Sequence, residues 1–143
     1  MRIYQAGPLF TAAEIRWHHD FKKKLTDAGY DVQWPGDFFS QGEIDAWGID
    51  APKFIMERDS AAIDACDILV ALLDGSQVDD GTAWEIGYAY AKGKPVIGIR
   101  TDFRNAGDTT HGRVNAMIEG SCVSIANDEQ GVLNTLRNLT SLL

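Results

Sequence analysis

Short apolar segments recur along this chain, and stretches with helical spacing separate them. The clearest segment is 68–73, which is uniformly apolar and ends at a turn-like Asp-Gly-Ser. Alternation of this kind is typical of a parallel sheet whose strands are joined by crossover helices. We therefore predict an α/β fold, with strands at residues 3–6, around Val32, and at 68–73, 96–99 and 122–126, and helices at 12–28, 52–65, 82–92 and 128–142.

Five strands in this alternation predict one three-layer, flavodoxin-like or Rossmann-like sheet of order 2-1-3-4-5. In such sheets ligands bind beside the strand ends at the point where the winding reverses. The loops expected there are 7–10, which begins with Gly7, and 74–81, which ends with Gly81. We expect a crevice between these two loops.

The length of 143 residues suits one domain that spans 1–143. Residues 34–48 and 101–112 show neither helical nor strand periodicity. Irregular segments of this length are often lids or binding loops. We therefore expect these two segments to be lids or binding segments.

The formal net charge of -8 argues against nucleic-acid and membrane partners, because phosphate backbones and anionic lipids repel an acidic surface. The first residues lack the pattern of a signal peptide, and no apolar stretch approaches the length that crosses a bilayer. We expect a cytoplasmic protein.

Glu85 is the most informative single residue. With Thr82 it forms the Thr-x-x-Glu spacing of a capping box, which predicts that its carboxylate reaches back to its own helix terminus. Asp79 precedes it in the same loop, so the alternative is a carboxylate presented to a ligand at the sheet edge. A helix N-terminus favours the ionised form, and an ionised glutamate can act as a nucleophile.

Asp59 falls at helical spacing with Ile55, Ala62 and Ile63 on one side of the helix 52–65. An acid on an apolar face either finds partners or takes up a proton, and a protonated carboxyl group can serve as a catalytic acid. The alternative is a helix register that turns Asp59 to the surface beside Arg58.

Other polar and aromatic residues leave two interpretations open. Tyr4 either packs in the core or orients the oxygens of Glu85. Phe10 and Trp47 are packing aromatics or stack on a planar ring. His18 and His19 cannot share a metal ion, because adjacent helical residues point about 100° apart. The glycines around Glu85 match neither a dinucleotide fingerprint nor a Walker loop.

Two motifs together carry a resemblance to a known family. They are the segment Tyr-Gln-Ala-Gly-Pro-Leu-Phe at 4–10 and the pattern Asp-x-Gly-Thr-Ala-x-Glu-x-Gly at 79–87. With Asp59, Asp67 and the Gly-Lys-Pro-Val segment at 93–96, they make the chain resemble the nucleoside 2-deoxyribosyltransferases over residues 2 to 120.

The resemblance implies a mechanism as well as a fold. Glu85 matches the nucleophile that attacks the anomeric carbon of a 2′-deoxyribonucleoside, after which a second free nucleobase takes the sugar. Asp59 and Asp79 match acids around the sugar and base, Tyr4 matches the phenol that positions the nucleophile, and Phe10 lies where members of the family contact the base. The resemblance implies no metal and no organic cofactor.

The resemblance also implies a homo-oligomer, because in this family a neighbouring subunit completes the site through an Asn-x-Met segment. Asn115 and Met117 fit that segment. Residues 34–48 do not align, so Asp37 and Trp47 are base-contact candidates from their residue types alone, and the range of bases stays open.

Two other functions stay open beside transfer. One is hydrolysis of 2′-deoxynucleosides or their 5′-monophosphates. Against a phosphorylated substrate, Asn115 stands where those hydrolases have a phosphate-binding serine, and the loop 7–10 lacks their serine and arginine. The other is a nucleoside-binding module in which Glu85 is only a helix cap.

Overall fold

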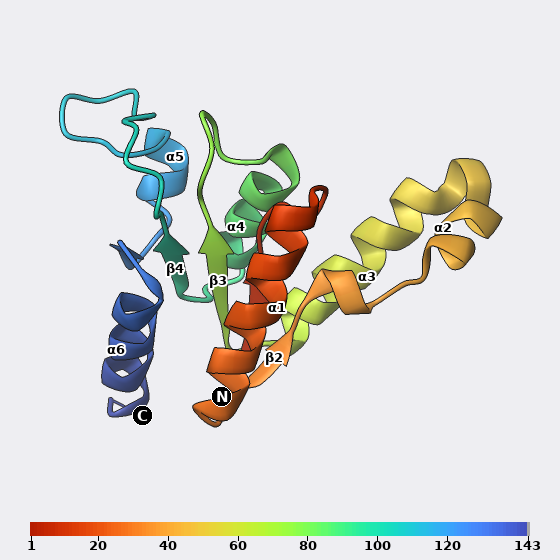
Figure 1. The fold of residues 1–143 in the computed structure, drawn as a ribbon, viewed down its shortest axis with the longest axis horizontal. Helices are drawn as coiled ribbons and strands as arrows, with labels where there is room; N and C mark the ends of the chain where they lie inside the picture. The colour runs from red at the N-terminus through yellow and green to blue at the C-terminus, as the bar shows by residue number, and fades with distance from the viewer. Residues whose placement is uncertain (143) are drawn as a thin grey trace.

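The computed structural model describes residues 1–142 and centres on a five-stranded sheet in which every pair of neighbours is parallel. The strands are β1 (Arg2–Ala6), β2 (Asp31–Gln33), β3 (Ile68–Leu72), β4 (Val96–Ile99) and β5 (Ser124–Ala126). They lie in the order β2-β1-β3-β4-β5, which confirms the predicted order (Figure 1).

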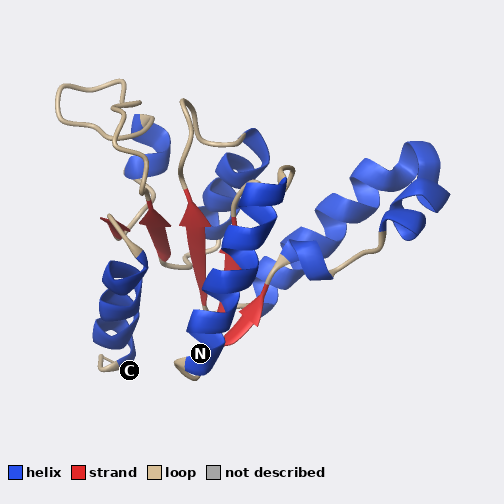
Figure 2. Ribbon diagram, viewed as in Figure 1, coloured by secondary structure: helices blue, strands red, loops and turns tan. Residues whose placement is uncertain are grey.

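Helices cover both faces of the sheet (Figure 2). One face carries α1 (Ala12–Asp27) and α6 (Glu129–Thr140), whose buried residues join one apolar cluster with Ile3, Val70 and Ile97. The other carries α3 (Ala51–Ala65), α4 (Asp80–Ala91) and α5 (Ala116–Glu119), which pack over Leu69 and Ala71. Successive residues of β3 therefore face opposite layers, as strand geometry requires.

Several helices begin and end at the capping residues and glycines that their sequences contain. Thr11 and Glu14 form a complete capping box at the start of α1. Gly29 and Gly93 follow helices with positive φ angles of 94° and 72°, a conformation that costs glycine little. Asp50 is the residue before α3, but its side chain makes no capping hydrogen bond.

The segment 34–48 is largely helical, which corrects the expectation of an irregular loop. It contains η1 (Pro35–Asp37) and α2 (Gln41–Trp47), and η2 (Gly48–Asp50) follows. A capping box at Ser40 starts α2, yet none of its residues is buried, so the helix lacks the apolar stripe by which helices are recognised. In Figure 1, α2 and the start of α3 extend away from the sheet.

The segment 101–112 contains no helix or strand, as predicted. None of the helices within residues 1–142 combines the length and the apolar character that a membrane span requires.

Candidate active site

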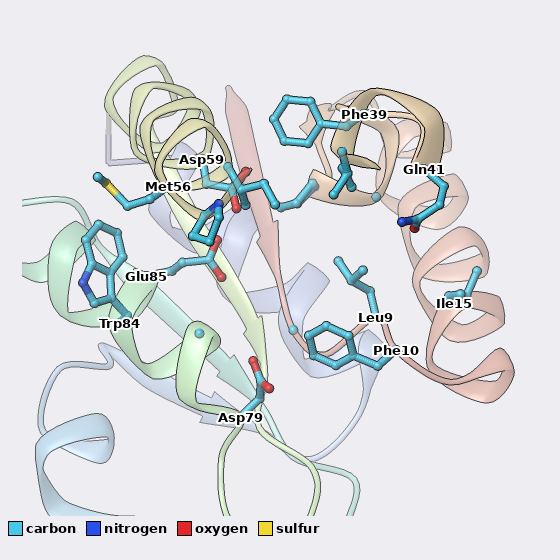
Figure 3. Close-up of a pocket in the computed structure, with 17 residues that line it drawn as sticks. Leu9, Phe10, Ile15, Phe39, Gln41, Met56, Asp59, Asp79, Trp84 and Glu85 are labelled. Carbon is cyan, nitrogen blue, oxygen red and sulfur yellow. The ribbon is translucent and has the colours of Figure 1, made fainter. Parts of the chain in front are cut away.

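A cavity of about 760 Å³ opens beside the ends of β1 and β3, where the winding of the sheet reverses. In Figure 3 the carboxylates of Asp59, Asp79 and Glu85 lie around one part of it, and mostly apolar side chains surround the rest. The lining residues are Gly7, Leu9, Phe10, Ile15, Pro35, Gly36, Phe39, Gln41, Ile44, Pro52, Ile55, Met56, Asp59, Asp79, Gly81, Trp84 and Glu85.

Glu85 points into this cavity from α4 and does not cap its own helix. Its Oε2 accepts a hydrogen bond from the hydroxyl of Tyr4, a fully buried residue of β1. The two residues lie 81 positions apart in the sequence, and the pairing of β1 with β3 brings them together. The capping-box interpretation of Glu85 is therefore wrong.

Burial sets the protonation of Glu85. Loss of hydration raises its pKa to about 8; the Tyr4 hydrogen bond opposes this rise, and the charges of Asp59 and Asp79 add to it. The expectation that the helix N-terminus keeps Glu85 ionised is therefore wrong, because burial outweighs any effect of the helix terminus on the pKa. Glu85 lies in the second turn of α4, beyond the first turn to which the dipole effect is confined.

Asp59 also lines the cavity, from α3. Its Oδ1 is buried and has no hydrogen-bond partner among the described residues, and burial raises its pKa to about 6. Arg58 instead lies over the ring of Phe38, 4.0 Å from its centre. The helix register thus turns Asp59 inward, and the surface alternative is wrong.

Asp79 has two roles in the structure, because it borders the cavity and also caps the N-terminus of α4. Its Oδ2 accepts hydrogen bonds from the backbone N–H of Thr82 at 3.0 Å and from the Thr82 hydroxyl at 2.9 Å. Helix α4 therefore begins at Asp80, earlier than the predicted start at Thr82.

The ends of β3 and β4 are tied together next to this loop. The side chain of Arg100 is buried and donates to the carbonyl oxygens of Leu73, Gly75 and Arg104. Asp102 accepts from the backbone N–H of Gly75 at 3.1 Å. These bonds fix the start of the loop that leads to Asp79.

Much of the apolar part of the cavity is formed by residues from three separate segments. Leu9 and Phe10 come from the loop after β1, Ile15 from α1, and Phe39 and Ile44 from the region of α2. Phe10 is 77% exposed, so a flat apolar ligand would cover it.

The remaining predicted site residues divide into two groups. Gly7 and Gly81 line the cavity. Asp37 and Trp47 are not among its lining residues, because Asp37 pairs with Lys22 at 2.5 Å and Trp47 packs edge-on against Phe39.

Asn115 and Met117 lie outside the cavity of their own chain. The Asn115 side chain caps α5 by accepting from the backbone N–H of Met117 at 2.9 Å, and it donates to Asp108 at 3.1 Å. Met117 is 81% exposed.

Several cavity residues were not singled out from the sequence, chiefly Ile15, Gln41, Met56 and Trp84. Trp84 directly precedes Glu85 within the second motif, which was a usable signal. Gln41 and Ile44 belong to the unrecognised helix α2, so no signal indicated them. Residues 1–142 contain no group of three or more His, Cys, Asp or Glu side chains placed to hold a metal ion.

Comparison with known proteins agrees with this geometry. Residues 3–128 match the family described as nucleoside 2-deoxyribosyltransferase. The chain belongs to this family. A curated relative, the uncharacterized protein C191.05c of Schizosaccharomyces pombe, is 36% identical over 107 residues, which are 71% of this chain and 51% of the relative. The chain thus spans about half the length of that relative.

Two solved structures in this fold bear on function. The 2-deoxyribosyltransferase of Bacillus psychrosaccharolyticus superposes with a TM-score of 0.73 at 26% identity, covering 94% of this chain and 91% of that one. The CMP N-glycosidase BcmB of Clostridium botulinum superposes with a TM-score of 0.62 at 25% identity, covering 96% and 99%. The first of these proteins is thus named as a deoxyribosyltransferase, and the second is named as an enzyme that cleaves an N-glycoside.

Proposed function

We propose that this protein transfers the 2-deoxyribosyl group of a 2′-deoxyribonucleoside to a free nucleobase through a covalent intermediate on Glu85. One observation carries the proposal: the carboxylate of Glu85 is held by Tyr4 inside a cavity that also contains Asp59 and Asp79. A nucleophile and acids around one space are what displacement at an N-glycosidic carbon requires.

In the first step, Oε1 of ionised Glu85 attacks C1′ and forms a C–O bond as the C1′–N bond breaks. The electron pair of the broken bond goes to the base nitrogen, which takes a proton from an acid that we assign to Asp59. In the second step, the incoming base gives its N–H proton back to this carboxylate and attacks C1′, which releases Glu85. Two displacements retain the configuration at C1′.

Tyr4 assists by occupying Oε2 of Glu85, which leaves Oε1 as the attacking atom. The pKa of Glu85 is about 8, so the form that reacts is the fraction that has given its proton to solvent. Positive charge that develops on the sugar stabilises the ionised form, so the approach to the transition state favours loss of this proton.

The apolar half of the cavity suits the nucleobase, with Phe10 against its face. We propose that Asn115 and Met117 act on a neighbouring subunit, since both lie outside their own cavity and Met117 is 81% exposed. The protein would then be a homo-oligomer with shared sites, and its role would be the cytoplasmic salvage of deoxyribonucleosides.

Incubation with deoxyinosine and free adenine, followed by chromatography, tests the proposal. We expect deoxyadenosine, and a loss of at least about a thousandfold in Glu85→Gln, which keeps the shape but removes the nucleophile. Glu57→Gln is the matched control, because Glu57 is an exposed residue of α3 that lies 3.8 Å from Lys53. Transfer that survives Glu85→Gln would exclude the covalent mechanism.

N-glycoside hydrolysis is the second candidate, favoured by the likeness to the CMP N-glycosidase. It predicts free sugar in the absence of an acceptor base and better turnover of a 5′-monophosphate. Binding without turnover, with unchanged affinity in Glu85→Gln, would instead indicate a nucleoside-binding module.

A further inference from the structure

His18 is a buried residue of α1 that lies behind the wall of the cavity. It is fully buried, and it is not among the residues that line the cavity. It contacts residues that adjoin two cavity-lining segments: Pro8, in the loop after β1, and Trp34, which precedes Pro35 and Gly36. These segments are separated by more than twenty residues in the sequence, and both contribute to the wall of the cavity.

Its hydrogen bonds fix one tautomer of the imidazole ring. The side-chain amide of Gln5 donates to the backbone oxygen of His18 at 3.0 Å and lies 2.9 Å from Nδ1. Because an amide nitrogen only donates, Nδ1 must accept, and the ring proton is on Nε2. That Nε2–H donates to the carbonyl oxygen of Pro8 at 3.0 Å. Burial lowers the pKa of His18 to about 4, which keeps the ring neutral.

A face of the imidazole ring of His18 contacts Trp34, which begins the segment 34–36. Trp34 stacks on His18 with ring centres 5.5 Å apart and an interplanar angle of 19°. The backbone of Gly36 lies so close to Trp34 that a Cβ there would be 2.4 Å from the indole. A Cβ on Gly7 would likewise be 2.7 Å from His18. Both glycines thus allow cavity-lining backbone to rest on this pair of rings.

A purely structural core residue would not need these polar contacts. An apolar ring could fill the volume, but it would leave the Gln5 amide and the Pro8 carbonyl without this partner, at a cost in free energy. The imidazole is suited to the position because one edge accepts and the other donates. What it holds in place is the backbone that leads to Leu9 and Phe10.

On the basis of the proposed function, we propose that His18 is a positioning residue that sets the nucleobase end of the cavity. It does so by fixing the loop 7–10 against the segment 34–36. The carboxylates lie on other elements, α3 and α4, so the effect of His18 falls on binding of the base and not on the displacement at C1′.

Two substitutions separate the contacts. In His18→Gln the side-chain amide extends far enough to donate to Pro8, whereas in His18→Asn the shorter chain reaches only the Gln5 side. In His18→Asn we expect KM for deoxyinosine to rise about five- to tenfold, while kcat stays within about twofold of the wild-type value. In His18→Gln we expect a KM closer to that of the wild type. His19→Asn is the control, because it removes an imidazole that packs edge-on against Trp34 and leaves the Pro8 bond in place.

Two measurements keep this test independent of activity. Nitrogen NMR of the wild-type protein should show the Nε2–H tautomer of His18 at pH 6 to 8, and amide exchange at residues 7–10 should accelerate in His18→Asn while β3 and β4 stay protected. If transfer fails in the wild type but both NMR results hold, only the proposed function is wrong. Three results would each overturn the positioning role. One is an Nδ1–H tautomer in the wild type, and another is unchanged KM and amide exchange in His18→Asn. The third is an equal rise of KM in His18→Asn and His18→Gln.

Discussion

Two opposing influences act on the carboxylate of Glu85. Burial raises its pKa, the hydroxyl of Tyr4 lowers it, and the balance leaves a value of about 8. The same hydroxyl fixes which oxygen is free to react. One phenol therefore tunes both the charge and the direction of the proposed nucleophile.

Tyr4→Phe tests this double role. Loss of the hydrogen bond removes an influence that lowers the pKa of Glu85. Because this pKa lies above that of Asp59, it sets the alkaline limb of the kcat/KM profile, and that limb should move to higher pH. We also expect kcat to fall about tenfold or more, from the loss of orientation. Tyr88→Phe is the control, because that phenol also bonds a carboxylate, that of Asp64, but lies outside the cavity. An unchanged pH profile in Tyr4→Phe would contradict the tuning.

Asp59 gives a second pH prediction. The proposal requires Glu85 ionised and Asp59 protonated, while their pKa values in the free protein are about 8 and about 6. Wild-type kcat/KM should therefore peak near pH 7 and fall on both sides, since acid protonates Glu85 and alkali ionises Asp59.

In Asp59→Asn the requirement for a proton on Asp59 disappears with the group. We expect a lower kcat/KM that rises with pH and then levels off, measured as initial rates between pH 5 and pH 9.5. A falling alkaline limb that persists in this variant would assign the acid to another residue, with Asp79 the next candidate.

The proposed reacting residues were recognisable in the sequence, and the apolar wall of the cavity was not. Glu85 and Asp79 stand in a compact motif, and Asp59 breaks an apolar helix face. The apolar wall is assembled from single residues of distant segments, such as Ile15 and Gln41, whose local patterns carry no sign of a ligand.

At the scale of elements, α4 begins with a residue that also borders the cavity. Asp79 caps the helix by accepting two hydrogen bonds from Thr82, and in doing so it holds the first turn that leads to Glu85. A structural and a proposed chemical role therefore coincide in one carboxylate.

Two substitutions separate these roles. Asp79→Ser keeps a good N-cap, whereas Asp79→Ala removes it and should destabilise the fold by about 1 kcal/mol in chemical denaturation. If the carboxylate itself serves the reaction, both variants should lose transfer activity to a similar extent. Activity that survives in Asp79→Ser would leave Asp79 with the cap alone.

Element prediction succeeded where burial creates a pattern. The strands β3 and β4 are buried along their whole lengths, and their apolar runs were recognisable. Helix α2 buries none of its residues and was missed. The start of α4 was misplaced because Thr82 and Glu85 imitate a capping box, while the cap that forms comes from Asp79.

At the scale of the whole molecule, our proposal includes a second copy of the chain that supplies Asn115 and Met117 to the site. The sheet order was predictable, because alternating strands and helices permit few topologies. The contribution of Asn115 and Met117 to a neighbour depends on an assembly that the fold of one chain does not determine.

Mixing two inactive variants tests the shared site. One carries Glu85→Ala, and the other carries Asn115→Ala with Met117→Ala. After co-refolding of equal amounts, random pairing in a two-fold arrangement should restore about a quarter of wild-type transfer activity, because each mixed pair contains one intact site. Separate refolding followed by brief mixing is the control. No recovery in assemblies shown to contain both chains would mean that each subunit supplies its own site.

The bond between Tyr4 and Glu85 joins positions 81 residues apart, through strands that are neighbours only in the finished sheet. A shortened or half-folded chain therefore has no partial version of the reaction centre. During synthesis on the ribosome, the nucleophile acquires its orienting phenol only after both strands have emerged and paired. Any activity that depends on this bond should therefore appear abruptly and late in folding.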